Sequence, residues 1–275
     1  MGGLVVRAKS GQGVHGTSSI SHPWEMASVS MRHPFKDSPN EDHFAVIPLT
    51  KKRLVLAVAD GCGGLANGHL ASQKAIAILH EHLTRSANLD PTLAILGAFE
   101  EANRQVLCDV PGGGTTLTVA LLDGQNVRAI HVGDSRVWIV NAKGVRYQTI
   151  SHSPVGYGQA SGLLSEQKAF QSARRHIVDN VIGSAEMRID IGPWIPLRIQ
   201  DRLVLASDGL FDNLKQNEIV KRVCKAEPAI GIERLTRLAQ QRMLMTSSTL
   251  PCKPDDLTII VAKYRPRLPR KRPAL

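Results

Sequence analysis

Acidic residues stand directly beside the most strand-like runs of this chain. The acids concerned are Glu41, Asp42, Asp60, Asp134, Asp208, Asp255 and Asp256. A carboxylate at the end of a strand sits on a rigid backbone and still reaches the edge of its sheet. Several such carboxylates meeting at one edge would repel one another strongly, so their proximity requires a divalent cation. Oxygen-only ligands of this kind suit the hard ions Mg²⁺ and Mn²⁺.

A single Asp-Gly after a strand is most often only a turn. Here Asp60-Gly61 and Asp208-Gly209 each follow a buried apolar run, a Gly-Asp-Ser lies at 133–135, and a Pro-Asp-Asp lies at 254–256. Turn formation alone does not explain this joint pattern. We therefore predict a metal-binding cleft that is built from strand ends.

The remaining pattern predicts one α+β domain. Short apolar runs bounded by turn residues indicate strands at 43–47, 53–59, 115–122, 127–132, 136–140, 145–150, 202–206 and 257–262. Apolar residues recur at helical spacing in 66–85, 91–108, 216–225 and 230–245. The four runs within 115–150 favour an antiparallel meander, because turn residues separate them. Helices segregated against antiparallel sheets are expected.

Composition indicates where the domain begins and ends, and it argues against a base-stacking nucleic-acid binder and against a membrane-spanning protein. Residues 1–27, rich in Gly, Ser and His, are expected to form a flexible leader, 28–264 the domain and 265–275 a basic tail. The net charge is +10, and six basic residues lie in the last 13 positions, so 10 − 6 = +4 remains for the rest. Aromatic residues make up only 4%, which argues against nucleic-acid binding by base stacking. No apolar run reaches the roughly 18 residues of a membrane span, and four cysteines without a CxxC pair suit a cytoplasmic protein.

In this order, the motifs resemble those of the metal-dependent serine/threonine phosphatases of the protein phosphatase 2C (PPM) type. The matching segments are NEDHFAV (40–46), LAVADGCGG (56–64), GGTTLTVALLDGQNVRAIHVGDSRVWIV (113–140), LVLASDGLFDNL (203–214) and PDDLTIIVAKY (254–264). The resemblance covers nearly all of residues 28–264. It implies an αββα sandwich, in which two packed antiparallel sheets are flanked by helices, with a dinuclear metal centre at one end.

The resemblance also implies roles for the acids, carried over by position. Asp60 would bridge two cations, Mn²⁺ or Mg²⁺, and the carbonyl of Gly61 would bind one of them. Glu41 would serve that same cation directly or through water. Asp208 and Asp255 would hold the other cation.

Three further acids have supporting roles in this comparison. Asp134 matches an acid that helps bind a third, weaker metal in bacterial members of the family. Asp42 would orient waters or ligands behind the metals. Asp256 stands where the family usually has Asn, so only a supporting role is expected for it.

The implied reaction is hydrolysis of phosphoserine and phosphothreonine in proteins. A hydroxide bridging the two cations would attack phosphorus in line, and catalysis would depend on Asp60 and Asp208. Phosphoproteins would be the substrates, and the enzyme would oppose a serine/threonine kinase as a cytoplasmic monomer. The resemblance implies no specific nucleic acid.

Two positions depart from the family's pattern. Asp37 replaces the usual phosphate-gripping Arg, so Lys36 or, further upstream, Arg32 is the candidate phosphate contact, although an ammonium is not a bidentate fork. Cys62 stands where many eukaryotic members have His, and its thiol is expected to have a raised pKa and mainly to pack. These departures leave open an alternative, a catalytically weak module that binds phosphoproteins or regulates a kinase.

Residues 153–190 cover the place where the family carries a mobile flap. Gly156, Gly158 and Gly162 are candidate hinges for it. His131 and His152, each considered as a single histidine, are expected to pack or lie at the surface rather than bind a metal.

Overall fold

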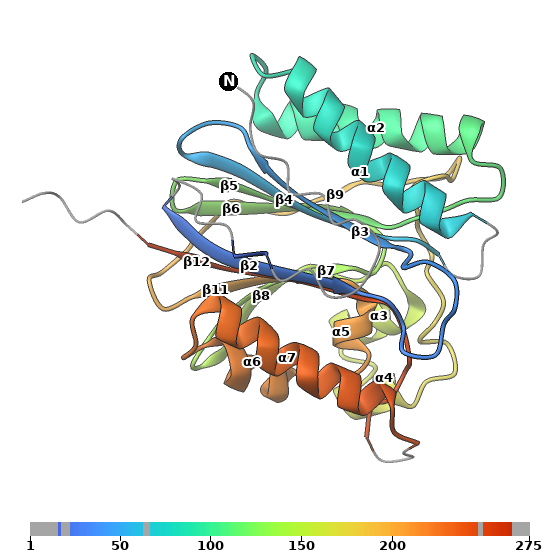
Figure 1. Cartoon of the computed structure of the whole chain (residues 1–275), viewed down its shortest axis with the longest axis vertical. Helices are drawn as coiled ribbons and strands as arrows, with labels where there is room; N and C mark the ends of the chain where they lie inside the picture. The colour runs from blue at the N-terminus through green and yellow to red at the C-terminus, as the bar shows by residue number, and fades with distance from the viewer. Residues whose placement is uncertain (1–15, 18–22, 63–66, 247–249, 266–275) are drawn as a thin grey trace, which may run out of the picture.

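The computed structural model describes residues 16–17, 23–62, 67–246 and 250–265. Two antiparallel sheets pack face to face, and helices cover the outer face of each (Figure 1). The predicted αββα sandwich is therefore confirmed. Within the described ranges, no helix is both long enough and apolar enough to cross a membrane.

Six strands form the sheet that we call the β12 sheet, in the order β1-β2-β12-β11-β7-β8. Its strands are β1 Gly16–Thr17, β2 Trp24–Met31, β7 Arg136–Asn141, β8 Gly144–Gln148, β11 Arg202–Ala206 and β12 Leu257–Tyr264. The other sheet, the β4 sheet, has the order β10-β6-β5-β4-β3, and β9 also pairs with β6. Its strands are β3 Asp42–Pro48, β4 Arg53–Asp60, β5 Leu117–Asp123, β6 Asn126–Val132, β9 Asp190–Ile191 and β10 Ile195–Pro196.

Each sheet has its own covering helices. On the β4 sheet lie α1 (Gly68–Arg85) and α2 (Pro91–Asp109), and on the β12 sheet lie α6 (Gln216–Val223) and α7 (Pro228–Met243). Three short helices complete the described fold: α3 Pro154–Ala160, α4 Glu166–Phe170 and α5 Asp208–Phe211. Helix α2 begins where it does because Asp90, which precedes it, accepts hydrogen bonds from the backbone of Thr92 and Leu93.

Strand β4 shows why a continuous apolar run is needed between the layers. Val55 and Ala57 pack among the residues beneath α1 and α2, whereas Leu54, Leu56 and Val58 pack against the other sheet. Successive side chains of a strand point to opposite faces, so a strand covered on both faces is apolar at every position.

The expected four-strand meander over 115–150 is wrong. Strands β5 and β6 form a hairpin in the β4 sheet, whereas β7 and β8 form a hairpin in the β12 sheet. The connection through Gly133 crosses from one sheet to the other. Gly133 has a φ of 106°, and a Cβ there would lie 2.5 Å from Thr116 Cβ, so this crossing requires glycine.

The expected domain start at residue 28 also needs correction. Strand β2 begins at Trp24 and pairs with β12 along its whole length, with Trp24 opposite Tyr264. The boundary therefore falls inside a strand. Arg265 likewise belongs to the fold, since its N–H donates to the Pro23 carbonyl (2.7 Å). The rest of the expected basic tail and most of the expected leader lie outside the described residues.

Candidate metal centre

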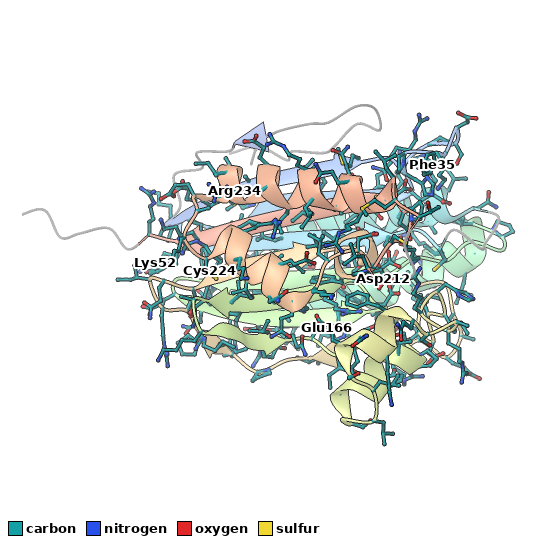
Figure 2. All side chains as sticks on the ribbon, turned by 90° about the horizontal axis from the view of Figure 1, so that it is seen from below. Phe35, Lys52, Glu166, Asp212, Cys224 and Arg234 are labelled. Atoms are coloured by element: carbon teal, nitrogen blue, oxygen red, sulfur yellow. The ribbon has the colours of Figure 1, made fainter. Side chains whose placement is uncertain are left out.

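One end of the two sheets carries a cavity of about 370 Å³ whose wall is rich in carboxylates. The carboxylates on this wall are those of Glu41, Asp60, Asp134, Asp208, Asp255 and Asp256. They come from strand ends in both sheets, as the sequence pattern predicts. Figure 2 shows Asp212, on the segment that follows α5, at the same end of the molecule as Phe35 and far from Lys52. Asp42 is buried and does not line the cavity.

Strand register places Asp42 and Asp60 opposite each other, where β3 begins and β4 ends. The backbone of Asp60 is fixed from two sides. Its N–H donates to Thr116 Oγ1 (2.9 Å), and its carbonyl accepts from Thr115 Oγ1 (2.8 Å) and the Thr116 N–H (2.8 Å). The Thr115-Thr116 pair therefore positions Asp60 directly.

Glycine is required where α1 approaches the acids. The Gly61 N–H donates to the Glu41 carbonyl (3.1 Å), and a Cβ on Gly61 would overlap the carbonyl of Gly68. A Cβ on Gly68 would lie 2.8 Å from Glu41 Oε1. A side chain would clash at both positions. Glycine avoids the clash, so α1 can begin beside the carboxylates and Gly61 remains part of the cavity wall.

Burial and mutual repulsion raise the pKa values of three of these carboxyl groups, those of Asp60, Asp134 and Asp255. The pKa of Asp60 is well above its ordinary value because of burial and, next, the charges of Asp42 and Asp208. Burial and then the charge of Asp208 raise the pKa of Asp134 to about 7 and that of Asp255 to about 7. Such a cluster retains protons near neutral pH unless cations replace them.

The donor set fits a hard divalent cation. Apart from one thiol, one imidazole, one hydroxyl and the ammonium of Lys253, the polar groups of the wall are carboxylate and carbonyl oxygens, which Mg²⁺ and Mn²⁺ prefer. Behind the wall, Asp42 Oδ2 accepts a hydrogen bond from Ser207 Oγ (2.7 Å), while its buried Oδ1 has no hydrogen-bond partner in the described structure. Burial, followed by the charge of Asp256, raises the pKa of Asp42. An orphaned buried oxygen here is what a nearby ion or its water would satisfy.

Lys253 reaches between three acids at this end of the molecule. Its Nζ lies 2.5 Å from Asp208 Oδ2, 3.0 Å from Asp255 Oδ2 and 3.2 Å from Asp212 Oδ2. Burial raises the pKa of Asp208, but the charge of Lys253, its hydrogen bond and smaller contributions from Asp60 and Arg136 together outweigh burial and hold this pKa below its ordinary value. The sequence pattern does not single out Lys253, because a loop lysine is normally a solvated charge. Its place two residues before Asp255 is the one available signal.

A second lysine, Lys36, lies on the other side of the cluster. It pairs with Glu41, and its Nζ lies 3.3 Å from Asp256 Oδ2. Burial lowers the pKa of Lys36, but the bond with Glu41 and the charge of Asp256 raise it above its ordinary value. Arg32 is exposed, its guanidinium donates to the Asp37 carbonyl (3.2 Å), and it does not line the cavity.

Cys62 lines the cavity and is half-buried. Burial, together with the charges of Asp134 and Asp208, raises the pKa of its thiol to about 12. The thiol therefore stays protonated at neutral pH, as expected from its neighbours, and it is a poor nucleophile and a poor proton donor.

The flap region, residues 153–190, contributes His176, Val178 and Val181 to the cavity wall. It is also joined to the segment that carries Lys253. Arg175 donates through Nη2 to the carbonyl of Cys252 (3.0 Å).

Two of the three expected hinge glycines lie inside α3. The Gly156 N–H donates to Ser153 Oγ (3.0 Å), and a Cβ on Gly156 would lie 2.6 Å from Ser151 Cβ. Gly158 packs against Leu164. These positions serve close packing, and of the three only Gly162 has a positive φ, 75°.

A separate cluster of possible metal ligands lies behind the β6–β7 connection. His131, His152 and Asp190 each offer one ligand atom, and these atoms lie within 4.8 Å of one another. The two rings stack with centroids 4.5 Å apart, and His131 Nε2 lies 2.8 Å from the Ile150 carbonyl. The two histidines are thus not isolated as the sequence suggests, because the fold joins residues that are far apart in the chain.

Hydrogen bonds to the other ring nitrogen of His152 argue against a metal in this second cluster. The Gly133 N–H lies 3.1 Å from His152 Nδ1, and Asn180 Nδ2 lies 2.8 Å from it. Asn180 cannot be reversed, because its Nδ2 and Oδ1 also bond the Arg188 carbonyl and N–H. Nδ1 is therefore an acceptor, so Nε2 carries the proton and donates it to Asp190 Oδ2 (3.1 Å). Through the hydrogen bond to His152 Nδ1, this cluster holds the backbone of Gly133, the residue before Asp134.

Comparisons with known proteins agree with this geometry. The family model described as Protein phosphatase 2C matches residues 31–243. Serine/threonine phosphatase stp of Listeria innocua is 27% identical over 231 residues, which span 75% of this chain and 91% of that protein. Serine/threonine protein phosphatase PstP of Mycobacterium tuberculosis is 29% identical over 218 residues, which span 76% of this chain and 40% of that protein.

Solved structures show the same architecture. The crystal structure of Mycobacterium tuberculosis PstP/Ppp has a TM-score of 0.72 at 27% identity and covers 88% of this chain and 99% of that one. The catalytic domain of PstP in complex with two manganese ions has a TM-score of 0.66 at 26% identity and covers 87% of this chain and 97% of that one.

The four-layer sandwich with acids at the ends of both sheets is the architecture of a metal-dependent phosphatase. The chain belongs to the protein phosphatase 2C family. It is a PPM-type protein serine/threonine phosphatase, as the resemblance of its motifs implies. No observation favours the catalytically weak module that the two departures left open.

Proposed function

We propose that this phosphatase holds two divalent cations, Mn²⁺ or Mg²⁺, in the acid-lined cavity and uses them to hydrolyse phosphoserine and phosphothreonine in proteins. The convergence of carboxylates from both sheets on one cavity carries this proposal. So many buried acids destabilise a metal-free fold, and cations offset that cost.

The positions of the acids support a division of labour. Asp60 interacts with acids from both sheets, among them Asp42 and Asp208, which suits it to bridge the two cations. The Gly61 carbonyl and Glu41 would hold one cation on its side. Asp208 and Asp255 would hold the other on the opposite side.

Three more acids would support this centre. Asp134 would help hold a third, weaker cation, since it shares the same cavity. Asp256 accepts hydrogen bonds from the backbone of His33 (2.6 Å) and Glu41 (2.7 Å), so it would fix Glu41 rather than bind a metal. Asp42, held by Ser207, would orient water behind the metals.

When bound, divalent cations lower the pKa of coordinated water towards neutrality and neutralise phosphoryl oxygens. Asp60 and Asp208 would hold the cations at fixed positions, because Thr115 and Thr116 anchor the backbone of Asp60 and Asp208 is the first residue of α5. The contribution of the chain is therefore positioning and charge balance. Cys62, with its pKa of about 12, would take no part as a nucleophile.

We assign the phosphate contact to Lys36 rather than to Arg32. Lys36 is paired with Glu41 and Asp256 at the edge of the cluster. A cation bound by Glu41 would weaken that pair and leave the ammonium available to a phosphoryl oxygen. Arg32 is exposed and bonded to the Asp37 backbone.

We also propose a cellular setting for this enzyme. The enzyme would act as a monomer in the cytoplasm and oppose a serine/threonine kinase in signalling. All four cysteines are free thiols, which supports a reducing compartment.

Hydrolysis of p-nitrophenyl phosphate and of a phosphothreonine peptide, with Mn²⁺ and with chelator, tests the proposal. Wild type should turn over both substrates only with the metal, and Asp60→Asn should not. Asp109→Asn is the matched control, because Asp109 lies at the end of α2 and pairs with Lys74 (2.8 Å). Wild-type protein that shows no metal-dependent turnover, and does not differ from Asp60→Asn, would contradict the proposal.

A further inference from the structure

Lys253 occupies a place among the acids that a cation would be expected to take. Three oxygens from three different carboxylates, those of Asp208, Asp212 and Asp255, surround its Nζ at 2.5–3.2 Å. Carboxylates collected around one point are how proteins hold a hard divalent cation. The side chain of Lys253 is only 18% exposed, so this is not a solvated surface pair.

The backbone beneath Lys253 is held firmly. Asn213, which is fully buried, accepts from the Lys253 N–H (2.8 Å) and donates to the Lys253 carbonyl (2.7 Å). Arg175 from the flap region bonds the preceding carbonyl, that of Cys252 (3.0 Å). The ammonium is therefore presented to the acids by a fixed main chain, and only rotation of its flexible stem can withdraw it.

The two lysines of the acid cluster, Lys253 and Lys36, differ in where they come from and in which acids they contact. On the other side, Lys36 touches Glu41 and Asp256 from the exposed stretch 32–39. Neither lysine forms an ion pair with Asp60 in the described structure. The position next to Asp60 and the Gly61 carbonyl has a lysine only at its Glu41 edge, whereas the position among Asp208, Asp212 and Asp255 has an ammonium at its centre.

We propose that the Lys253 ammonium is an internal competitor for one divalent cation, so that this centre binds its first cation readily and its second only when Lys253 swings out. This inference rests on the proposed metal centre. An ammonium carries one charge and needs longer N–O distances than the roughly 2.0–2.2 Å metal–oxygen distances of Mg²⁺ or Mn²⁺, so the two cannot share the position. The cation concentration would then set how much enzyme carries both ions.

Calorimetric titration of metal-free protein with Mn²⁺ alone tests the competition. Lys253→Met keeps the length of the stem and removes the charge. Its second binding step should be at least about tenfold tighter than that of wild type, or should appear where wild type shows none, because one adjacent positive charge is gone. Lys74→Met, which removes the same charge at the partly exposed pair with Asp109, should leave the titration unchanged.

A second measurement uses wild type alone and does not depend on folding of the variant. Amine acetylation read by mass spectrometry should label Lys253 slowly without metal and at least about fivefold faster with saturating Mn²⁺, because a withdrawn ammonium is exposed to solvent. Labelling of Lys74 should not change.

The outcomes separate this inference from the proposed function. Equal second steps in wild type and Lys253→Met, or Lys253 labelling that stays slow with bound Mn²⁺, would overturn the competition and leave the metal centre standing. No Mn²⁺ binding by either protein would overturn both.

Discussion

Two clusters of potential metal ligands lie near the β6–β7 connection, and they differ in the negative charge that they collect. Asp42 Oδ1 in the acid cluster and His131 Nδ1 in the histidine cluster are both buried without a hydrogen-bond partner in the described structure. In the acid cluster, burial and then the charges of neighbouring carboxylates raise the pKa of Asp60 well above its ordinary value. In the histidine cluster, both nitrogens of His152 are used, one as an acceptor and one as a donor. Proximity of ligand atoms is therefore a weaker sign of a metal site than a group of buried carboxylates whose negative charges are not fully neutralised.

The largest difference between the clusters is expected in metal-dependent turnover, when one aspartate in each cluster is replaced by asparagine. Asp208→Asn should lower metal-dependent turnover on the order of 10²–10³-fold, the effect typical of removing one electrostatic stabiliser of a transition state. Asp190→Asn should change it by less than about threefold, because an amide oxygen still accepts from His152. Initial rates on p-nitrophenyl phosphate at saturating Mn²⁺ measure both. Equal losses in the two variants would remove the distinction.

The pH dependence of metal stabilisation sharpens the comparison. In the metal-free protein, Asp134 and Asp255 have folded pKa values of about 7, above the unfolded value of 3.8. Stability contributed by their bound protons is thus complete below pH 3.8 and is lost as the pH rises through about 7. Mn²⁺ should replace those protons, so the rise in Tm on adding Mn²⁺ should be about 5–10 °C larger at pH 8 than at pH 5. A rise that is the same at both pH values would contradict this reasoning.

The stability contributed by the histidine cluster should change with pH in the opposite direction, falling as the pH drops. Burial, and next the electrostatic effect of the neighbouring His152, lower the pKa of His131 from 6.5 to about 4. The unfolded chain takes up the proton first, so stability falls as the pH drops from 6.5 towards 4, by at most about 3 kcal/mol for this group. His131→Gln should flatten that part of the profile, measured by urea unfolding of metal-free protein. A difference between wild type and variant that is constant with pH would show that His131 does not titrate there.

The smallest effect on turnover is expected for substitution of Cys62, which lines the cavity but is expected neither to bind a metal nor to react. Its thiol, with a pKa of about 12, is neutral at pH 8, and Cys62→Ser keeps a small neutral group. Turnover should change by less than about threefold, since no charge is lost. Slow alkylation by iodoacetamide relative to the exposed Cys108 is the companion measurement. A large loss of activity in the serine variant would instead give the thiol a chemical role.

The acids could be predicted from the sequence because each adjoins an unmistakable strand, and strand ends meet at sheet edges. The crossing at Gly133 could not be predicted, since a short turn between β-rich runs looks the same whether the second strand joins the first sheet or the opposing one. Lys253 also escaped prediction, because nothing local distinguishes a lysine among acids from a solvated one. The contact of His131 with His152 and Asp190 depends wholly on tertiary pairing.

Strand β12 has a consequence for how this enzyme is made. It lies between β2 and β11, so a strand from the end of the described chain is inserted beside one from its beginning. Asp255 and Asp256 immediately precede it. During synthesis on the ribosome, the chain up to β11 already contains most of the acids but lacks these two and the middle strand of one sheet. Phosphatase activity can therefore begin only after the last strand has emerged and the sheet has closed.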